Sequence, residues 1–264
     1  MHSHRFGFTL IEVSIVLVII GLIVGGVLSG RELIEAARGR QQVSQIQEYT
    51  VAMTAFQSKY KGLPGDISID DAVRFNLYCD SCGDYDGIEG LFNGDGILKG
   101  YHAAAVRNAF LFPEPALFFA QLSSAGLISG TYTFTGGGVA YPGVDFPAAK
   151  IDKSVGILPI TPYSWGGIWL AFCPTAGGYY FGWLSQACPT TPVKPMHGHY
   201  IDSKMDDGVP SSGIVRAGKL TSVPDDQSVE VDDDPASNCV IDVSGSAYNI
   251  NDGEGRCRIF VRLQ

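Results

Sequence analysis

Basic residues are scarce in this chain of 264 residues. It has 18 Lys and Arg against 27 Asp and Glu, which gives a formal net charge of −9 at pH 7. Proteins that bind nucleic acid through a general surface need clustered Lys and Arg to contact the phosphates. The composition therefore argues against nucleic-acid binding of this kind, while a role in DNA uptake stays open.

Charge of either sign is absent from Val13 through Gly30, and Glu12 is the single charged residue between Phe8 and Gly30. A helix over residues 8–30 would be about 34 Å long, enough to cross a hydrocarbon layer ~30 Å thick. A carboxylate in such a helix is costly in lipid, so Glu12 is expected to have a function and a partner. These residues predict a membrane segment.

Residues 1–7 lack a hydrophobic stretch of their own and an Ala-x-Ala site, so they are not a secretory signal peptide. Arg5 in this short leader is expected to stay cytoplasmic by the positive-inside bias. The bulk of the chain would then lie across the membrane.

The run Gly7-Phe8-Thr9-Leu10-Ile11-Glu12 resembles the processing site of type IV prepilins and of the pseudopilins of type II secretion. The resemblance implies that prepilin peptidase cuts between Gly7 and Phe8 and methylates the new amine of Phe8. If neighbouring helices are staggered, this amine can meet Glu12 of the next subunit, and leaving either charge alone would cost ~3–5 kcal/mol. Phe8 and Glu12 are therefore the predicted assembly residues. The alternative is an ordinary signal anchor with a stray Glu.

This resemblance predicts a structural subunit of a type IV pilus-like filament. The precursor would be stored in the bacterial inner membrane with its globular domain in the periplasm, and then built into a filament in the periplasm or at the cell surface. Its expected partners are prepilin peptidase, other pilin or pseudopilin subunits and membrane lipid. A pseudopilin and a membrane-anchored periplasmic binding domain are the alternatives. We expect no enzyme, because the sequence has no Ser-His-Asp pattern, phosphate-binding glycine loop or strong metal cluster.

Proline is absent from the hydrophobic run, where many pilins and the main pseudopilin carry one. This departure, with the large domain, favours a minor or specialised subunit. Beyond Gly30 the pattern continues as an amphipathic helix to about Lys61, with Gly62 and Pro64 ending it. The predicted apolar positions are Leu33, Ile34, Ala37, Val43, Ile46, Tyr49, Met53, Phe56 and Tyr60, opposite Arg38, Arg40, Gln41, Gln45, Glu48 and Lys59.

The sequence thus predicts four parts: a leader over 1–7, a transmembrane and filament-core helix over 8–30, its amphipathic continuation over 31–62, and a globular domain over 63–264. The expected fold class is α+β, with the long helix packed on a disulfide-containing domain that holds an antiparallel sheet, as in pilins. In the domain we predict helices over 103–112 and 116–125, broken at two prolines. Strands are predicted over 131–135, 155–162, 168–173 and 256–263, with 179–184 as the hairpin partner of 168–173 and 223–238 as a polar loop.

Six cysteines lie in three local pairs: Cys79 with Cys82, Cys173 with Cys188, and Cys239 with Cys257. An exported domain favours disulfides, and proximity favours this pairing, although fifteen connectivities exist. The two longer loops would each add about 3 kcal/mol of stability. A redox or zinc role for the Cys79–Cys82 pair is the alternative, and the sequence has no second Cys-x-x-Cys to complete a zinc site.

Clustered acidic residues raise the question of calcium. Asp-x-Asp-Gly and Asn-x-Asp-Gly turns supply several oxygens, but they also occur as plain turns, and no EF-hand is complete. The calcium candidates are Asp84, Asp86, Asn93, Asp95, Asp202, Asp206 and Asp207. We predict a structural turn over 200–213 with calcium as the alternative, and an exposed loop for His197 and His199 rather than a metal pair. No other cofactor is expected.

Overall fold

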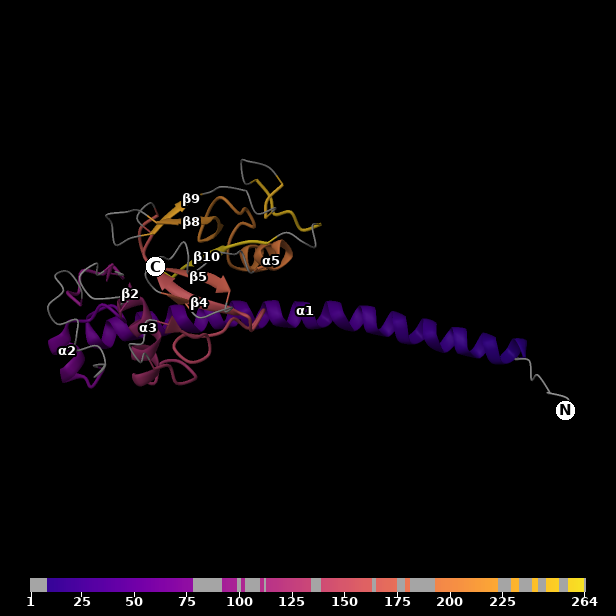
Figure 1. The fold of residues 1–264 in the computed structure, drawn as a ribbon, viewed down its shortest axis with the longest axis horizontal. Coiled ribbons are helices and arrows are strands. Elements are labelled where there is room, and N and C mark those ends of the chain that lie inside the picture. The colour runs from indigo at the N-terminus through magenta and orange to yellow at the C-terminus, as the bar shows by residue number, and fades with distance from the viewer. Residues whose placement is uncertain are drawn as a thin grey trace.

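One helix of 51 residues, α1 (Leu10–Tyr60), runs from an isolated N-terminal half into a globular α+β domain (Figure 1). The computed structural model describes residues 9–77, 92–98, 101–102, 110–111, 113–133, 139–162, 165–174, 179–180, 193–222, 229–232, 239–241, 246–251 and 256–263. The other helices are α2 (Ile69–Arg74), α3 (Pro113–Ser124) and α5 (Pro195–Met205). The strands are β1 (Tyr101–His102), β2 (Phe110–Leu111), β3 (Val139–Ala140), β4 (Val155–Ile160), β5 (Trp169–Pro174), β6 (Tyr179–Tyr180), β7 (Val215–Ala217), β8 (Lys219–Ser222), β9 (Val229–Asp232) and β10 (Ile259–Arg262).

The continuity of α1 confirms the prediction of one long helix, which is about 77 Å long at ~1.5 Å per residue. It ends where expected, because Lys61 adopts a left-handed conformation with φ 60° and its N–H bonds to the carbonyl of Gln57. Gly62 and Pro64 follow, and neither favours helix. The first half of α1 therefore extends from the domain as a single rod (Figure 1).

The second half of α1 buries the predicted apolar face in the domain core. Ile46, Met53 and Phe56 are at most 1% exposed, and Tyr49 and Tyr60 are also buried. Their three-and-four spacing puts them on one side of the helix, where they join a core with side chains from α3, β4 and β5. Burial of this face fixes the helix to the domain.

The predicted apolar face begins later than the sequence suggested. Leu33 and Ile34 are 72% and 53% exposed, because the described part of the domain contacts α1 from about Glu35 onward. Gln45, expected on the solvent side, is instead buried together with Gln42. The prediction was wrong at these positions because the helical period locates a face, whereas the length of the domain decides how much of it is covered.

The two buried glutamines hold the chain before β4 against α1. Gln42 Oε1 accepts hydrogen bonds from the backbone N–H groups of Lys150 and Ile151, at 2.8 and 3.2 Å. Gln45 Nε2 donates to the carbonyl of Ala148 at 3.0 Å. Side chains of the long helix thereby satisfy backbone groups of the segment that precedes β4.

The central sheet is antiparallel throughout, with strand order β4-β5-β10-β7. Strands predicted over 155–162, 168–173 and 256–263 are confirmed as β4, β5 and β10. The predicted hairpin of 168–173 with 179–184 is wrong, because β4 and β10 occupy both edges of β5 and β6 pairs with β3 instead. The C-terminal strand β10 thus lies inside the sheet rather than at its edge.

Three further local predictions are corrected. Residues 110–111 form β2, paired with β1, so the helix predicted over 103–112 does not include its last described residues. Pro113 and Pro115 lie in the first turn of α3, where proline costs no hydrogen bond, and do not break a helix. Residues 131–133 form no strand, whereas 229–232, expected in a polar loop, form β9 opposite β8.

The predicted stop of the second helix near Gly126 is confirmed. Gly126 has φ 71°, a left-handed conformation that glycine adopts without steric cost. The N–H of Leu127 reaches back to the carbonyl of Leu122 at 3.0 Å, which closes the helix end in a Schellman-like turn.

Candidate functional site

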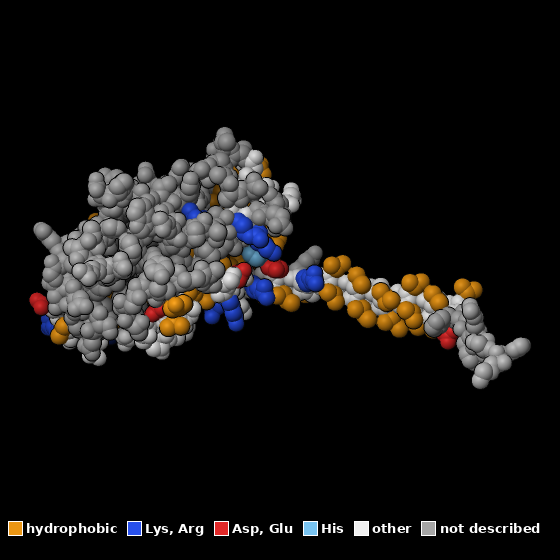
Figure 2. Space-filling model, viewed as in Figure 1, with side chains coloured by type: hydrophobic (Ala, Val, Ile, Leu, Met, Phe, Trp, Pro, Cys, Tyr) orange, Lys and Arg blue, Asp and Glu red, His pale blue; other side chains and the backbone are white. Residues whose placement is uncertain are grey.

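The N-terminal half of α1 presents apolar side chains that no other described part of the chain covers. An 18-residue window of this helix has a mean hydropathy of 2.7, and none of that window is buried. Leu10, Leu17 and Leu22 are 93%, 64% and 72% exposed. Figure 2 shows orange side chains along this half of the helix, with no domain over them. The segment is long and apolar enough to cross a membrane.

Glu12 and Thr9 bind each other at the start of α1. Glu12 Oε2 accepts the backbone N–H of Thr9 at 2.8 Å and its hydroxyl at 2.7 Å, while Thr9 Oγ1 accepts the N–H of Glu12 at 3.3 Å. This is a capping box, in which two helix-end N–H groups are satisfied reciprocally. The Thr-x-x-Glu pattern was present in the sequence, but Thr9 was not singled out there.

The structure therefore gives Glu12 a partner inside its own chain. The predicted partner, the amine of Phe8 in a neighbouring subunit, lies outside the described residues, as does the predicted cut between Gly7 and Phe8. The carboxylate is otherwise exposed near the N-terminal end of α1. The assembly role of Phe8 and Glu12 stays a prediction.

Four glycines of α1 lie in the uncovered half: Gly21, Gly25, Gly26 and Gly30. A Cβ built at any of them would meet nothing within 4 Å in the same chain. They therefore serve no packing contact within the described part of the chain. Their four-residue spacing, Gly21 to Gly25 and Gly26 to Gly30, is the kind that lets apolar helices approach closely in a membrane.

Comparison with known families identifies this region. The prokaryotic N-terminal methylation motif matches residues 2–28. Residues 2–28 are a type IV prepilin-like segment. The match includes Gly7, Phe8 and Glu12, and it supports a type IV pilin-like or pseudopilin protein in general. No curated protein and no solved structure matches the chain.

The prepilin-like segment implies processing by prepilin peptidase and assembly with other pilin subunits. Together with the apolar first half of α1, it is consistent with anchoring in the inner membrane. The same segment points to a structural protein rather than an enzyme. The family match ends at residue 28, so it does not extend to the globular domain.

Three of the calcium candidates meet at the C-terminal end of α5. One oxygen each of Asp202, Asp206 and Asp207 lies within 4.8 Å of the others. Three carboxylates are a donor set that suits a hard cation. The predicted turn is corrected in one respect, because residues 200–205 are helical and Asp202 is fully buried in α5.

These carboxylates already have hydrogen-bond donors. Asp202 accepts the hydroxyl of Tyr248 at 2.8 Å and the N–H of Gly208 at 2.9 Å, and Asp206 accepts the N–H groups of Ile214 and Val215. Burial raises the pKa of Asp202 to about 6, although the hydrogen bonds from Tyr248 and Gly208 act to lower it. The cluster thus fastens α5 to the turn before β7, and calcium binding stays a prediction.

Asp207 differs from its buried neighbour. It accepts the hydroxyl of Ser212 at 2.7 Å and the N–H of Val209 at 2.8 Å, and these bonds hold the pKa of this exposed carboxyl below its usual value. Its position is that of a residue that closes a turn.

The candidates Asn93 and Asp95 also lie in a turn. Asn93 Oδ1 accepts the N–H of Asp95 at 3.1 Å, and Asp95 Oδ1 accepts that of Ile97 at 3.0 Å. Asp66, buried just after α1, accepts the N–H groups of Gly94 and Gly96 at 3.0 and 2.7 Å. The sequence analysis did not predict this role of Asp66, whose carboxylate binds backbone groups 28 and 30 residues later in the chain. The candidates Asp84 and Asp86 lie outside the described residues.

Cys239 and Cys257 form a disulfide, as predicted, with their Cα atoms 4.9 Å apart. Cys257 also exchanges two backbone hydrogen bonds with Val193, just before α5. Cys173 takes part in a disulfide as well, but its predicted partner Cys188 lies outside the described residues. Cys79 and Cys82, which were also predicted to pair, both lie outside the described residues.

His197 and His199 lie on α5 and not in an exposed loop, so that prediction was wrong. The Nε2 atom of His197 lies 2.6 Å from Oε2 of Glu35 on α1. His199 is half-buried and its ring stands near Ser203 and Tyr248. The two imidazoles serve different contacts, because the helix turns their side chains about 200° apart.

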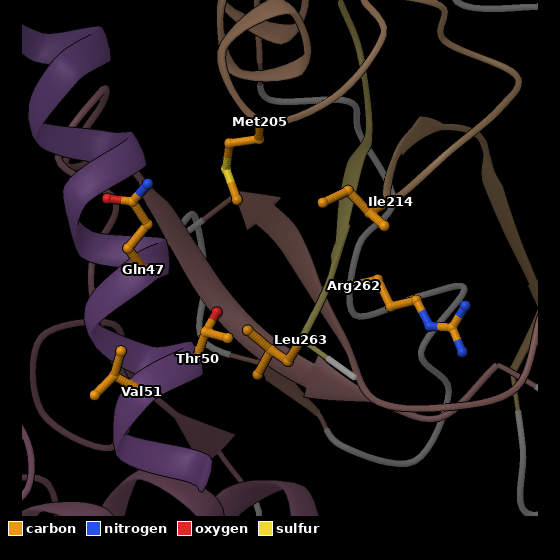
Figure 3. A pocket seen from close by; sticks show the side chains of 7 residues that line it. All are labelled: Gln47, Thr50, Val51, Met205, Ile214, Arg262 and Leu263. Atoms are coloured by element: carbon orange, nitrogen blue, oxygen red, sulfur yellow. The ribbon is translucent and has the colours of Figure 1, made fainter. Parts of the chain in front are cut away.

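An open groove of about 440 Å³ lies between α1, α5 and the C-terminal end of the chain (Figure 3). Its lining is almost entirely apolar and holds one titratable group, the guanidinium of Arg262. The lining residues are Gln47, Thr50, Val51, Met205, Ile214, Arg262 and Leu263. The groove has no pair of groups for acid–base or nucleophilic chemistry.

Proposed function

We propose that this protein is a minor or specialised pilin: it is stored in the inner membrane, cut by prepilin peptidase after Gly7, and built into a type IV pilus-like filament. The prepilin-like segment at 2–28 is the observation that carries this proposal. The uncovered apolar half of α1 supports it, because a surface that no described residue of the chain covers suits first lipid and then neighbouring helices.

The absence of proline before Pro64 supports the minor or specialised role. An α1 without proline is continuous from Leu10 to Tyr60, whereas a proline in the apolar run would give the helix a place to open during packing. A subunit with an unbroken helix and a large acidic domain is better suited to occupy a few positions in a filament than to form the whole filament. The methylation motif is equally compatible with a pseudopilin of a secretion system.

Glu12 provides the experiment. In cells, Glu12→Ala should still insert in the membrane but should enter filaments at least about a hundredfold less, because the partner amine is left unpaired in an apolar setting at a cost of ~3–5 kcal/mol. Thr9→Ala is the matched control. It removes the two hydrogen bonds of the Thr9 hydroxyl with Glu12 but keeps the carboxylate and its backbone donor, so its assembly should stay within a few-fold of the original protein.

The measurement is the amount of each variant in sheared, purified filaments relative to the amount in the membrane fraction. Equal assembly of Glu12→Ala and the original chain would overturn the assembly role of Glu12. Equal loss in both variants would instead assign the effect to the helix cap.

A further inference from the structure

Basic side chains gather where α1 leaves its apolar half and meets the domain. Arg31, Arg38 and Arg40 on α1 and Lys194, which precedes α5, are all exposed. We call these four residues the basic collar. In Figure 2, blue side chains stand at this junction, directly beyond the orange side chains of the apolar half.

The packing of α5 on α1 places Lys194 at the level of Arg31. His197 lies beside Glu35, and Tyr200 lies against Gly39. Both residue numbers rise together from the first contact to the second, by three on α5 and by four on α1, so α5 runs parallel to α1. Lys194 precedes His197 by three residues and therefore stands about one turn nearer to the apolar half, beside residue 32 of α1.

The collar is an exception in an acidic chain. Its four cations and the neighbouring Glu32 and Glu35 sum to +2, so the rest of the 264 residues carries −9 − 2 = −11. A negatively charged surface would attract this end of the domain and repel the remainder. The charge distribution thus favours one orientation of the domain on such a surface.

Two residues of the collar, Arg31 and Lys194, lie at the height of the headgroups above the apolar segment, whereas Arg38 and Arg40 lie beyond it and act at longer range. Arg31 is three residues, about 4.5 Å, past Leu28, the last large apolar residue of the uncharged run. The headgroup layer is ~5–8 Å thick on each side of the hydrocarbon, so Arg31 and Lys194 fall within it. Arg38 lies ~10 Å further along α1, close to the screening length of ~8 Å at physiological salt.

Met196 adds an apolar contact at the same level. It lies in the first turn of α5 and is 46% exposed. An apolar side chain beside cations is the composition of segments that lie at a lipid interface.

We propose that the basic collar and Met196 form a lipid-contacting surface, which holds the base of the domain on the headgroups of anionic phospholipids while the subunit is stored in the membrane. This inference rests on the proposed function, because it assumes that the apolar half of α1 spans a bilayer. The contact sets the domain in one orientation before assembly.

Site-specific photocrosslinking of the full chain tests this contact. A benzophenone amino acid replaces Met196, and the protein is reconstituted in nanodiscs of phosphatidylcholine alone or mixed with phosphatidylglycerol. Mass spectrometry should detect lipid adducts at position 196 mainly in the phosphatidylglycerol discs, with a yield that falls at high salt. Lys194→Gln and Arg31→Gln should each lower the yield about fivefold, as expected for one cation near a charged bilayer.

Two controls match these changes. Lys59→Gln neutralises a cation 28 residues beyond Arg31, ~42 Å along α1, and should leave the yield unchanged. The same probe at exposed Asn93, whose neighbour Gly94 bonds to Asp66 just after the C-terminal end of α1, should give no lipid adduct.

Each other outcome overturns the proposal. Equal adduct yields in both kinds of disc would show that the contact does not depend on anionic lipid. Adducts to a second protein chain would show that the collar is a subunit interface. No adduct from a chain that resists alkaline extraction would refute the collar contact but leave membrane storage standing. A chain that is extracted would refute membrane storage itself, and the inference with it.

Discussion

The ring of Tyr200 lies against Gly39, so that a Cβ at position 39 would stand 2.6 Å from two of its ring carbons. Real Cβ atoms do not approach that closely, so α5 can pack on α1 here only because position 39 has no side chain. The neighbouring contact of His197 with Glu35 depends on the same close approach of the two helices.

Gly39→Ala should therefore destabilise the domain. Gly30→Ala is the matched control, because both changes gain the same helix propensity and a Cβ at Gly30 meets nothing within 4 Å. We expect Gly39→Ala to be less stable than Gly30→Ala by about 1–3 kcal/mol, the usual cost of overpacking. Unfolding of the purified full chain in detergent measures this difference, and equal stability would refute the tight contact.

Asp202 should make stability depend on pH. Burial raises its folded pKa to about 6, above the unfolded value near 3.9, so the folded state holds the proton more tightly. This contribution is fully present below about pH 4 and is lost as the pH rises through 6. The free energy of unfolding should fall over this window by roughly 1–3 kcal/mol.

Asp202→Asn removes the titration and keeps an oxygen that can accept the bonds of Tyr248 and Gly208. The difference in unfolding free energy between this variant and the original chain should change between pH 4 and pH 6 and be constant above pH 7. The lowered pKa of Asp207 acts at more acidic pH and does not overlap this window. A difference that does not vary with pH would contradict the assignment.

The disulfide between Cys239 and Cys257 should contribute measurably to stability. It closes a loop across a sequence separation of 18 residues, which corresponds to about 3 kcal/mol in the chain-entropy model. The double variant Cys239→Ser, Cys257→Ser should lose about that amount in denaturant unfolding. A loss under about 1 kcal/mol would mean that the backbone pairing with Val193 already fixes this loop.

The glycines in the uncovered half of α1 should matter for assembly and not for folding. A Cβ at position 25 would meet nothing within 4 Å, and Gly25→Leu raises both helix propensity and hydrophobicity, so insertion and domain stability should be unchanged. Its bulk would keep neighbouring helices apart, so we expect several-fold less of it in filaments. Val24→Leu is the control, and equal incorporation of the two variants would exclude close helix approach at Gly25.

The long helix and the prepilin-like segment could be predicted because both are written in local sequence. An apolar run, a three-and-four spacing and a Gly-Pro stop describe α1 to within two residues at each end. The strands β4 and β5 were predictable for the same reason, since each is a short apolar run bounded by turn residues.

What the sequence did not show depends on partners distant along the chain. Gln42 looks like a solvent-facing helix residue until the loop at 148–151 is placed beside it, 108 residues later. His197 was expected in an exposed loop, because no third ligand at a convincing spacing favoured a metal pair with His199. In the structure Gly198 is buried inside α5, where a Cβ would stand 2.7 Å from Cδ1 of Ile259.

The predictions at Pro113, the first residue of α3, and at the polar run 229–232 were wrong for a different reason. Pro113 is compatible with the end of one helix and with the start of another, and only the pairing of β2 with β1 decides between them. Residues 229–232 have a weak strand pattern of their own, and β8 supplies the partner that makes them a strand.

The central claim is that the chain is cut after Gly7 and assembled through the new end of α1. Mass spectrometry of the N-terminal peptide, taken from protein in the cell envelope, tests it most directly. We predict a chain that begins with N-methylated Phe8 and lacks residues 1–7. A chain that still begins at Met1 in membranes and in any filament would contradict the account.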